Sequence, residues 1–310
     1  MMTNLLFTWK PPFSLDRIQN AVEGLKVQVS DDPAEILKLL PDAEIVCVAN
    51  WNAEMLRVAK KLRWVQAFSG GINGLLFPEF VVSPIPLTSL KGNFSLPAAE
   101  YAMGVMLAFS RRLEYDIRQR PQRTFVASEP TELYGKTVGI VGLGSMGVEI
   151  AKRCRCFQMK VLAMASQPRK DVDLVDQWYP SDRLVQLLAA SDYIVVAVPL
   201  TKLTHGMIGE HELTTMKPSA YLIDVSGRPA IYDLTALTRA LQSRRIAGAS
   251  LQMVPEVNSP LWDLDNLILS FHRTVSREQM ERSIETFCEN LRRYSRGETL
   301  LGLVDKQAGY

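Results

Sequence analysis

The sequence predicts an α/β protein of two domains, each built on a doubly wound parallel sheet. Its 310 residues exceed what one hydrophobic core usually organises, and 47% hydrophobic with 22% charged residues is ordinary for a folded protein. Short apolar runs alternate with amphipathic stretches along the chain. A glycine-rich turn at residues 142–147 follows one of these apolar runs and precedes a helical pattern, as expected where a strand feeds a helix.

The first part of the chain, to about residue 95, predicts a small α/β domain. Its apolar runs are typical of strands, and the stretches between them have helical spacing. The expected strands are residues 5–9, 26–30, 44–49 and 64–69, and the expected helices are 34–40 and 53–62. Residues 97–112 then carry apolar side chains at helical spacing, which indicates a long helix between the domains. A polar stretch, residues 118–132, follows it.

The second part of the chain begins with one βαβ unit. Residues 137–141 form an apolar strand, a helix runs from the glycine turn to about residue 157, and residues 160–164 form the next strand. Further helices are expected at 182–190, 210–216 and 234–243, and further strands at 193–198, 220–225, 247–253 and 267–271. A last helix, residues 276–293, is expected to pack back on the N-terminal domain.

Composition excludes several classes of function. The formal net charge is only +2, with basic and acidic residues mixed, so we expect no nucleic-acid partner. No apolar stretch approaches membrane-spanning length, and the apolar run at residues 5–7 has no basic flank or cleavage site, so we expect a cytoplasmic protein with no membrane association. The four cysteines, Cys47, Cys154, Cys156 and Cys288, lack metal-ligand spacing. We interpret them as reduced thiols and expect no metal.

The glycine turn has the pattern that binds a dinucleotide. Gly142 permits the tight turn, Gly144 lets the backbone approach a pyrophosphate, and Gly147 allows close packing of the helix on the strand. The helix beginning at Ser145 and Met146 then offers amide groups and the positive end of its dipole to the phosphates. The alternative is a glycine-rich turn without a ligand. The complete βαβ context favours nicotinamide dinucleotide binding.

The residues after the second strand of this unit favour NADPH over NADH. NAD-specific domains have an acidic residue there, which binds the ribose 2′-hydroxyl, whereas this chain has Ala165. Ser166 and Arg169 follow and can donate to a 2′-phosphate. The alternative is that these residues form a solvated loop.

Several separate segments carry a family resemblance. They are residues 69–73, 99–101, 134–144, 198–204 and 259–262 with Asn266. In their order and spacing the chain resembles the D-isomer-specific 2-hydroxyacid dehydrogenases, particularly the glyoxylate/hydroxypyruvate reductase branch. The resemblance implies a flavodoxin-like substrate domain from residues 1–96 and 275–310, an NAD(P)-binding Rossmann domain from 97–274, and a homodimer. It also implies NAD(P)H-dependent reduction of a small 2-oxo acid to the D-2-hydroxy acid.

That chemistry needs a hydride, a proton donor and a cation that binds the substrate carboxylate. Of the three histidines, His272 is the expected donor, because it follows the strand 267–271 at its carboxyl end and matches the family's catalytic histidine; His205 and His211 are expected to face solvent. The resemblance also implies a glutamate that orients the ring and favours its protonated form, and Glu256 is the candidate for it. The alternative for His272 is a histidine that merely ends a strand.

The cation is expected to be Arg228, although the family order is changed. Family members read Asn-Val-small-Arg-Gly, whereas this chain reads Asp-Val-Ser-Gly-Arg over residues 224–228. A shift of one residue in extended chain turns a side chain to the opposite face, but Gly227 tolerates backbone angles that restore the direction. The alternative is a surface arginine.

The resemblance implies the remaining site residues. Cofactor contacts are expected from Val198, Pro199, Thr204, Val225 and Gln252, and substrate contacts from Gly70, Gly71, Ile72 and Trp51. Gln252 stands where the family has Asp, and Phe271 stands where it has Pro. Together with the changed Arg-Gly order, these departures leave a second hypothesis open, a catalytically impaired NAD(P)-binding regulatory or sensor module.

Overall fold

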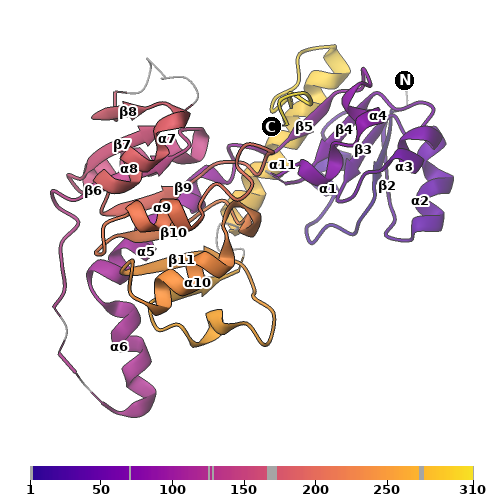
Figure 1. Ribbon diagram of the computed structural model, residues 1–310. Coiled ribbons are helices and arrows are strands. Elements are labelled where there is room, and N and C mark those ends of the chain that lie inside the picture. Colours follow the sequence, from indigo (N-terminus) through magenta and orange to yellow (C-terminus); the bar gives the residue numbers. More distant parts are fainter. Residues whose placement is uncertain are drawn as a thin grey trace. The chain divides into compact units, whose positions relative to one another are not determined.

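The computed structural model describes residues 3–69, 71–124, 126–127, 129–165, 173–271 and 276–309. The chain divides into two compact units. The first unit combines Met1–Phe94 with Ser276–Tyr310, and the second is Ser95–Val275. Each unit contains a fully parallel sheet with helices on both faces, so the predicted fold class is confirmed (Figure 1).

The first unit is built on a five-stranded sheet in the order β2-β1-β3-β4-β5. This order is the flavodoxin-like arrangement of a doubly wound sheet. The strands are β1 (Thr3–Phe7), β2 (Leu25–Val29), β3 (Ile45–Val48), β4 (Trp64–Ala67) and β5 (Leu87–Ser89). The helices are α1 (Asp16–Gln19), α2 (Pro33–Leu39), α3 (Ala53–Val58), α4 (Pro78–Val81) and α11 (Arg277–Arg296).

Alternate side chains of these strands face two separate cores. In β1, Leu6 packs with residues of α2, α3 and α4, whereas Leu5 and Phe7 pack with residues of α1 and α11. Both faces of the sheet are therefore covered, which explains why its strands read as continuous apolar runs. Helix α11 comes from the far end of the chain, and it completes this unit.

The second unit is built on a seven-stranded sheet in the order β12-β11-β10-β9-β6-β7-β8. The strands are β6 (Thr137–Val141), β7 (Lys160–Met164), β8 (Gln177–Tyr179), β9 (Tyr193–Val196), β10 (Tyr221–Asp224), β11 (Gly248–Gln252) and β12 (Leu267–Ser270). The helices are α5 (Ser95–Ser110), α6 (Leu113–Gln119), α7 (Ser145–Cys156), α8 (Leu184–Ala190), α9 (Glu210–Thr215) and α10 (Leu234–Gln242). This is the strand order of a dinucleotide-binding Rossmann domain, extended by one strand.

The same alternation builds two cores in the second unit. Tyr193 and Val195 of β9 face α5 and α7, whereas Ile194 and Val196 face α8, α9 and α10. The chain also forms short 3-10 helices at Leu40–Asp42, Asn73–Leu75, Arg120–Gln122, Ser181–Arg183, Pro229–Ile231 and Pro260–Asp263. No helix among the described residues is long and apolar enough to cross a membrane.

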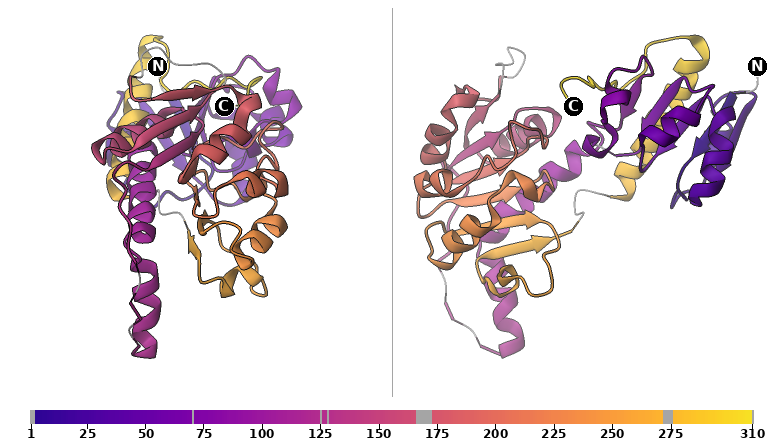
Figure 2. Two further views of the ribbon diagram at one scale, coloured as in Figure 1. Left: turned by 60° about the vertical axis from the view of Figure 1, so that its left-hand side comes forward. Right: turned by 45° about the vertical axis from the view of Figure 1, so that its right-hand side comes forward.

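Several elements differ from the sequence-based expectation. The long helix expected at 97–112 ends at Ser110, because Arg112 takes a left-handed conformation with φ 59°, and α6 then begins. Helix α6 includes the first two residues of the expected polar stretch 118–132. It extends away from the sheet of its own unit (Figure 2). The edge strands β5 and β8 have only three residues each, too few to show a period in the sequence.

Candidate functional site

The glycine turn lies at the point where the sheet of the second unit changes direction. Strand β6 pairs with β7 on one side and with β9 on the other, and its carboxyl end leads through residues 142–144 into α7. In open α/β sheets, ligands bind outside the carboxyl ends of the strands at such a switch point. The fold therefore places the predicted phosphate-binding turn where dinucleotides bind.

The three glycines of the turn have different surroundings. Gly142 has φ 99°, and a Cβ built on it would lie 2.7 Å from Cγ1 of Val198. A Cβ on Gly147 would overlap the carbonyl oxygen of Gly142. A Cβ on Gly144 would meet nothing within 4 Å. Gly142 and Gly147 are thus required by the packing of the turn itself, whereas the space over Gly144 is open to a ligand.

The first turn of α7 suits a phosphate. Its N-cap residue is Gly144, which supplies no side-chain hydrogen bond, and the first turn contains no acidic residue. Ser145 is exposed, and Met146 packs against the core that includes α5 and α7. Amide groups at the end of this twelve-residue helix are therefore left for an anion, in the field of the helix dipole. The turn fits the pyrophosphate of a dinucleotide.

The loop after β9 is held by a threonine. Oγ1 of Thr204 donates to the carbonyl of Pro199 at 2.6 Å and accepts the amide of Thr201 at 2.8 Å. Val198 lies against the glycine turn, as its distance from the Cβ position on Gly142 shows. Thr204 thus fixes the loop that borders the turn, and its contact with a cofactor stays a prediction.

Asp224 is the chief buried polar group at the carboxyl end of β10, and sequence reasoning did not single it out. Only 2% of its surface is exposed. Burial raises the pKa of its carboxyl, although the surrounding hydrogen bonds oppose that shift. Its oxygens accept from the hydroxyls of Ser226 and Tyr232 and from three backbone amides. The signal in the sequence was a carboxylate that directly ends the apolar run Tyr221–Asp224.

Arg228 lies in the loop after Asp224. It is half-buried, and its backbone amide donates to Oγ of Ser226 at 3.2 Å. Within the described part of the chain, its guanidinium forms no ion pair. Gly227, which precedes it, has φ 61°, a backbone angle disfavoured for other residues, whereas the direction that this gives the Arg228 side chain stays a prediction. Arg228 is thus a cation with no carboxylate partner among the described residues, at the edge of the sheet that bears the glycine turn.

Val225 and Gln252 lie beside this loop, at the carboxyl ends of the adjacent strands β10 and β11. The amide of Val225 donates to the carbonyl of Val196, which ties the loop to β9. Nε2 of Gln252 donates to the carbonyl of Asp224 at 3.4 Å, and only 7% of Gln252 is exposed. Gln252 therefore supports the same loop as well as lying at the predicted cofactor edge.

The proposed acid and its partner are only partly described. His272 lies outside the described residues, as do Ser166, Arg169 and Gly70. Glu256 is exposed, and its backbone carbonyl accepts from Nε1 of Trp262 at 2.9 Å, while its carboxylate has no partner among the described groups. Strand β12 pairs with β11 and ends at Ser270, two positions before the histidine. The pairing of Glu256 with His272 therefore stays a prediction.

The residues predicted to bind substrate lie in the first unit. Trp51 follows β3, and Gly71 and Ile72 follow β4, so they share the carboxyl edge of the sheet. Trp51 and Ile72 belong to one buried cluster, and the Trp51 ring packs edge-on against Phe80 with centroids 5.9 Å apart. The carbonyl of Gly71 accepts from Oγ of Ser69. The structure brings these residues together, and their contact with a substrate remains untested.

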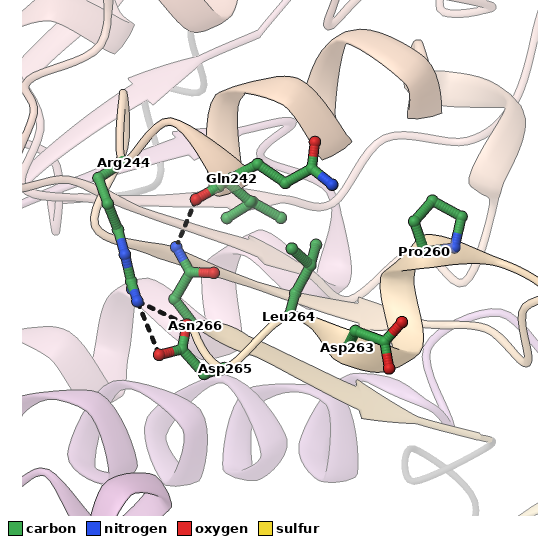
Figure 3. A pocket seen from close by; sticks show the side chains of 8 residues that line it. Gln242, Arg244, Pro260, Asp263, Leu264, Asp265 and Asn266 are labelled. Atoms are coloured by element: carbon green, nitrogen blue, oxygen red, sulfur yellow. Dashed lines mark hydrogen bonds and ion pairs between the residues drawn. The ribbon is translucent and has the colours of Figure 1, made fainter.

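A cavity of about 300 Å³ lies elsewhere in the second unit (Figure 3). Its lining residues are Leu241, Gln242, Arg244, Pro260, Asp263, Leu264, Asp265 and Asn266. They lie where α10 ends and before β12 begins, so the cavity is at the amino-terminal edge of the sheet, opposite the glycine turn. Arg244 is paired with Asp265 at 2.6 Å, and none of the candidate site residues that the structure describes lines this cavity.

The fold and the glycine turn define an NAD(P)-binding oxidoreductase, and comparison with known proteins places it in a family. The D-isomer specific 2-hydroxyacid dehydrogenase family, through its NAD binding domain, matches residues 103–274, more than half of the chain. This protein belongs to that family and is a D-2-hydroxyacid dehydrogenase.

Individual relatives agree with this assignment. The glyoxylate reductase of Thermofilum pendens is 34% identical over 288 residues, which cover 88% of this chain and 84% of that protein. The glyoxylate reductase of Korarchaeum cryptofilum is 34% identical over 83% of this chain and 80% of its own length. Among solved structures, a D-isomer specific 2-hydroxyacid dehydrogenase family protein from Aeromonas salmonicida superposes with a TM-score of 0.83 at 28% identity, over 99% of this chain and all of that one.

Proposed function

We propose that this protein uses NADPH to reduce a small 2-oxo acid of the glyoxylate or hydroxypyruvate type to the D-2-hydroxy acid. The observation that carries the proposal is Arg228, a cation with no carboxylate partner among the described residues, located at the same sheet edge as the glycine turn. The substrate type follows from the glyoxylate reductases, to which this chain is 34% identical.

Each proposed residue has one task in the reduction. NADPH, when bound, supplies the hydride that adds to the carbonyl carbon. Arg228 binds the substrate carboxylate and polarises the carbonyl, and His272 donates a proton to the carbonyl oxygen. Glu256 orients the imidazole ring and favours its protonated form. The family resemblance assigns substrate contacts to Gly70, Gly71, Ile72 and Trp51 as well.

The proposed preference for NADPH over NADH rests on the residues that follow β7. This strand follows α7 and ends at Met164, so Ala165 occupies the position at which an acidic side chain would bind the 2′-hydroxyl of NADH. The missing carboxylate removes its repulsion against a 2′-phosphate, and Ser166 and Arg169 can donate hydrogen bonds to that phosphate.

A homodimer is the expected assembly, and it follows from the family resemblance. Leu113 and Ile117 of α6 are 48% and 70% exposed, and a second copy would bury such apolar surface. The mass of the protein in solution, measured by light scattering, tests this.

The test of the function is a panel of 2-oxo acids assayed with NADPH and with NADH, together with His272→Ala. We expect glyoxylate or hydroxypyruvate to be reduced with a lower KM for NADPH than for NADH. Because a general acid contributes about 10²–10⁴-fold to rate, His272→Ala should lower kcat by that range and leave NADPH affinity unchanged. The matched control is His211→Ala, at the exposed start of α9.

Two outcomes would contradict the proposal. A parental rate in His272→Ala would remove the histidine from the mechanism. Tight NADPH binding without reduction of any 2-oxo acid would favour a catalytically impaired binding module.

A further inference from the structure

The carboxylate of Asp224 is surrounded by hydrogen-bond donors. Oδ1 accepts the backbone amide of Ser226 at 2.9 Å, the hydroxyl of Ser226 at 2.6 Å and the hydroxyl of Tyr232 at 3.0 Å. Oδ2 accepts the amides of Gly227 at 3.2 Å and of Gln252 at 3.4 Å. Both oxygens thus only accept hydrogen bonds. The donors are Gln252 on β11, Ser226 and Gly227 near the start of the loop 225–231, and Tyr232 directly after that loop.

This environment requires a carboxylate rather than an amide. An ionised carboxyl group accepts on both oxygens, whereas an asparagine side chain presents two N–H donors on one side. In either orientation of that amide, its NH₂ group would face at least two of the donors named above. Asp224 has no cationic partner within the described part of the chain, so these five hydrogen bonds alone compensate its burial.

The hydrogen bonds continue from Asp224 to Arg228. The hydroxyl of Ser226 donates to Oδ1 of Asp224 and accepts the backbone amide of Arg228 at 3.2 Å. The amide of Gly227, held on Oδ2, belongs to the residue with φ 61° that turns the chain immediately before Arg228. After Arg228, the 3-10 helix Pro229–Ile231 leads to Tyr232, whose hydroxyl donates a hydrogen bond to the same carboxylate.

We infer that Asp224 is a positioning residue whose buried carboxylate fixes the loop from which the Arg228 side chain starts. In this chain, where glycine precedes the arginine, the direction of that side chain is set by a turn built on Asp224. The inference rests on the proposed role of Arg228 for its effect on substrate, although the effect on the loop itself does not depend on that role.

Two variants test the inference. Asp224→Asn keeps the size of the side chain but places N–H groups against donors. Ser226→Ala removes only the hydroxyl that links Asp224 to the Arg228 amide, so it keeps the test informative if Asp224→Asn fails to fold. The matched control is Asp233→Asn, because Asp233 also accepts a backbone amide, that of Ala236 at 3.0 Å, but does so at the start of α10 outside this loop.

The first measurement is amide hydrogen exchange, which needs neither substrate nor turnover. Asp224→Asn should accelerate exchange of the amides of residues 226–228 by at least about tenfold and leave α7 unchanged. Ser226→Ala should accelerate exchange at residue 228. Asp233→Asn should affect the start of α10 alone. Unchanged exchange at residues 226–228 in Asp224→Asn would overturn the inference.

The second measurement is the affinity of the NADPH complex for oxamate, an anion with the shape of a 2-oxo acid, followed with kcat and KM. Because a displaced Arg228 holds the carboxylate less well, Asp224→Asn and Ser226→Ala should weaken oxamate binding and raise KM by about tenfold or more. In Ser226→Ala, NADPH affinity should stay within about twofold of the parent. Faster exchange with unchanged oxamate affinity and KM would show a merely structural role and overturn the inference. A parent that neither binds oxamate nor reduces 2-oxo acids would refute the proposed function, and the exchange result would still decide the effect of Asp224 on the loop.

Discussion

The glycines of the turn between β6 and α7 serve two separable purposes, packing and ligand access. Gly147 has no room for a Cβ beside the Gly142 carbonyl, whereas Gly144 has φ −77° and open space around it. A pattern in the sequence cannot distinguish these cases, because all three positions read simply as glycine. The distances from each Cβ position to the nearest atoms distinguish them.

We therefore predict opposite effects for two alanine substitutions. Gly144→Ala should leave the thermal midpoint unchanged or slightly raised, since alanine tolerates that backbone and restricts the unfolded chain, but should weaken NADPH binding by about tenfold or more because the methyl group occupies the ligand's space. Gly147→Ala should lower stability by about 1–3 kcal/mol through overpacking. Thermal denaturation and NADPH fluorescence titration measure both. Parental NADPH affinity in Gly144→Ala would contradict the assignment of the turn.

At the candidate site, sequence reasoning found the residues that belong to a pattern and missed the residue that organises them. The glycine turn was predicted from its context, and the structure places it at the switch point of the sheet. In the sequence alone, Asp224 is only the first residue of a changed motif. Asp224 is important because Tyr232, eight residues later, and Gln252, on the next strand, both donate hydrogen bonds to its carboxylate. Such contacts depend on the path of the loop, which no local period encodes.

At the scale of elements, the buried strands were predicted within a few residues, because parallel strands covered on both faces read as apolar runs. Strand β7 was predicted with its observed bounds, Lys160–Met164. The ends of helices were less predictable. The helix expected at 182–190 begins with the 3-10 helix Ser181–Arg183 before α8, and α6 follows α5 only because the backbone turns at Arg112.

Asp192 joins three elements, and we predict an acid-sensitive contribution to stability from it. Its carboxylate, just before β9, accepts the amide of Thr137 at the start of β6 and Nζ of Lys217 after α9, both at 2.8 Å. Burial alone would raise the pKa of Asp192, but the hydrogen bonds from Lys217 and Thr137 lower it below its ordinary value of 3.8. The unfolded chain then binds the proton more readily, so this stabilisation is present above about pH 3.8 and is lost as the pH falls through the folded-state pKa.

The test compares urea denaturation of the parent and of Asp192→Asn from pH 7 down to pH 3. The variant should lose about 1–2 kcal/mol at pH 7, and the difference should shrink as the pH falls below about 4. Asp265→Asn is the control, since the Arg244 and Asp265 side chains are 57% and 60% exposed, and such exposed pairs contribute little. A difference between parent and Asp192→Asn that is constant across this pH range would disprove the linkage.

At the scale of the whole molecule, the first unit is assembled from both ends of the chain. Helix α11 is capped by Ser276, whose Oγ accepts the Gln279 amide, and ends at Gly297 with φ 70°. Its apolar face, which includes Phe287, packs in the cluster formed with β1, β3 and β4. Among the described residues, neither core of the second unit includes any residue of α11. The stability of the first unit should therefore depend on α11, whereas we expect the second unit, Ser95–Val275, to depend on it less.

Phe287→Ala should consequently destabilise the first unit selectively. Phe287 is fully buried, with its ring centroid 5.1 Å from that of Phe68 and 5.5 Å from that of Trp64, so its truncation should cost about 3–5 kcal/mol. Hydrogen exchange should accelerate in β1, β3 and β4 while β6, β9 and β10 keep their protection, and NADPH should still bind. Leu237→Ala, which opens a cavity in the second unit beneath α10, should give the reverse pattern. Equal loss of protection in both sheets after Phe287→Ala would mean that the two units unfold as one, because the removed contacts lie in the first unit alone.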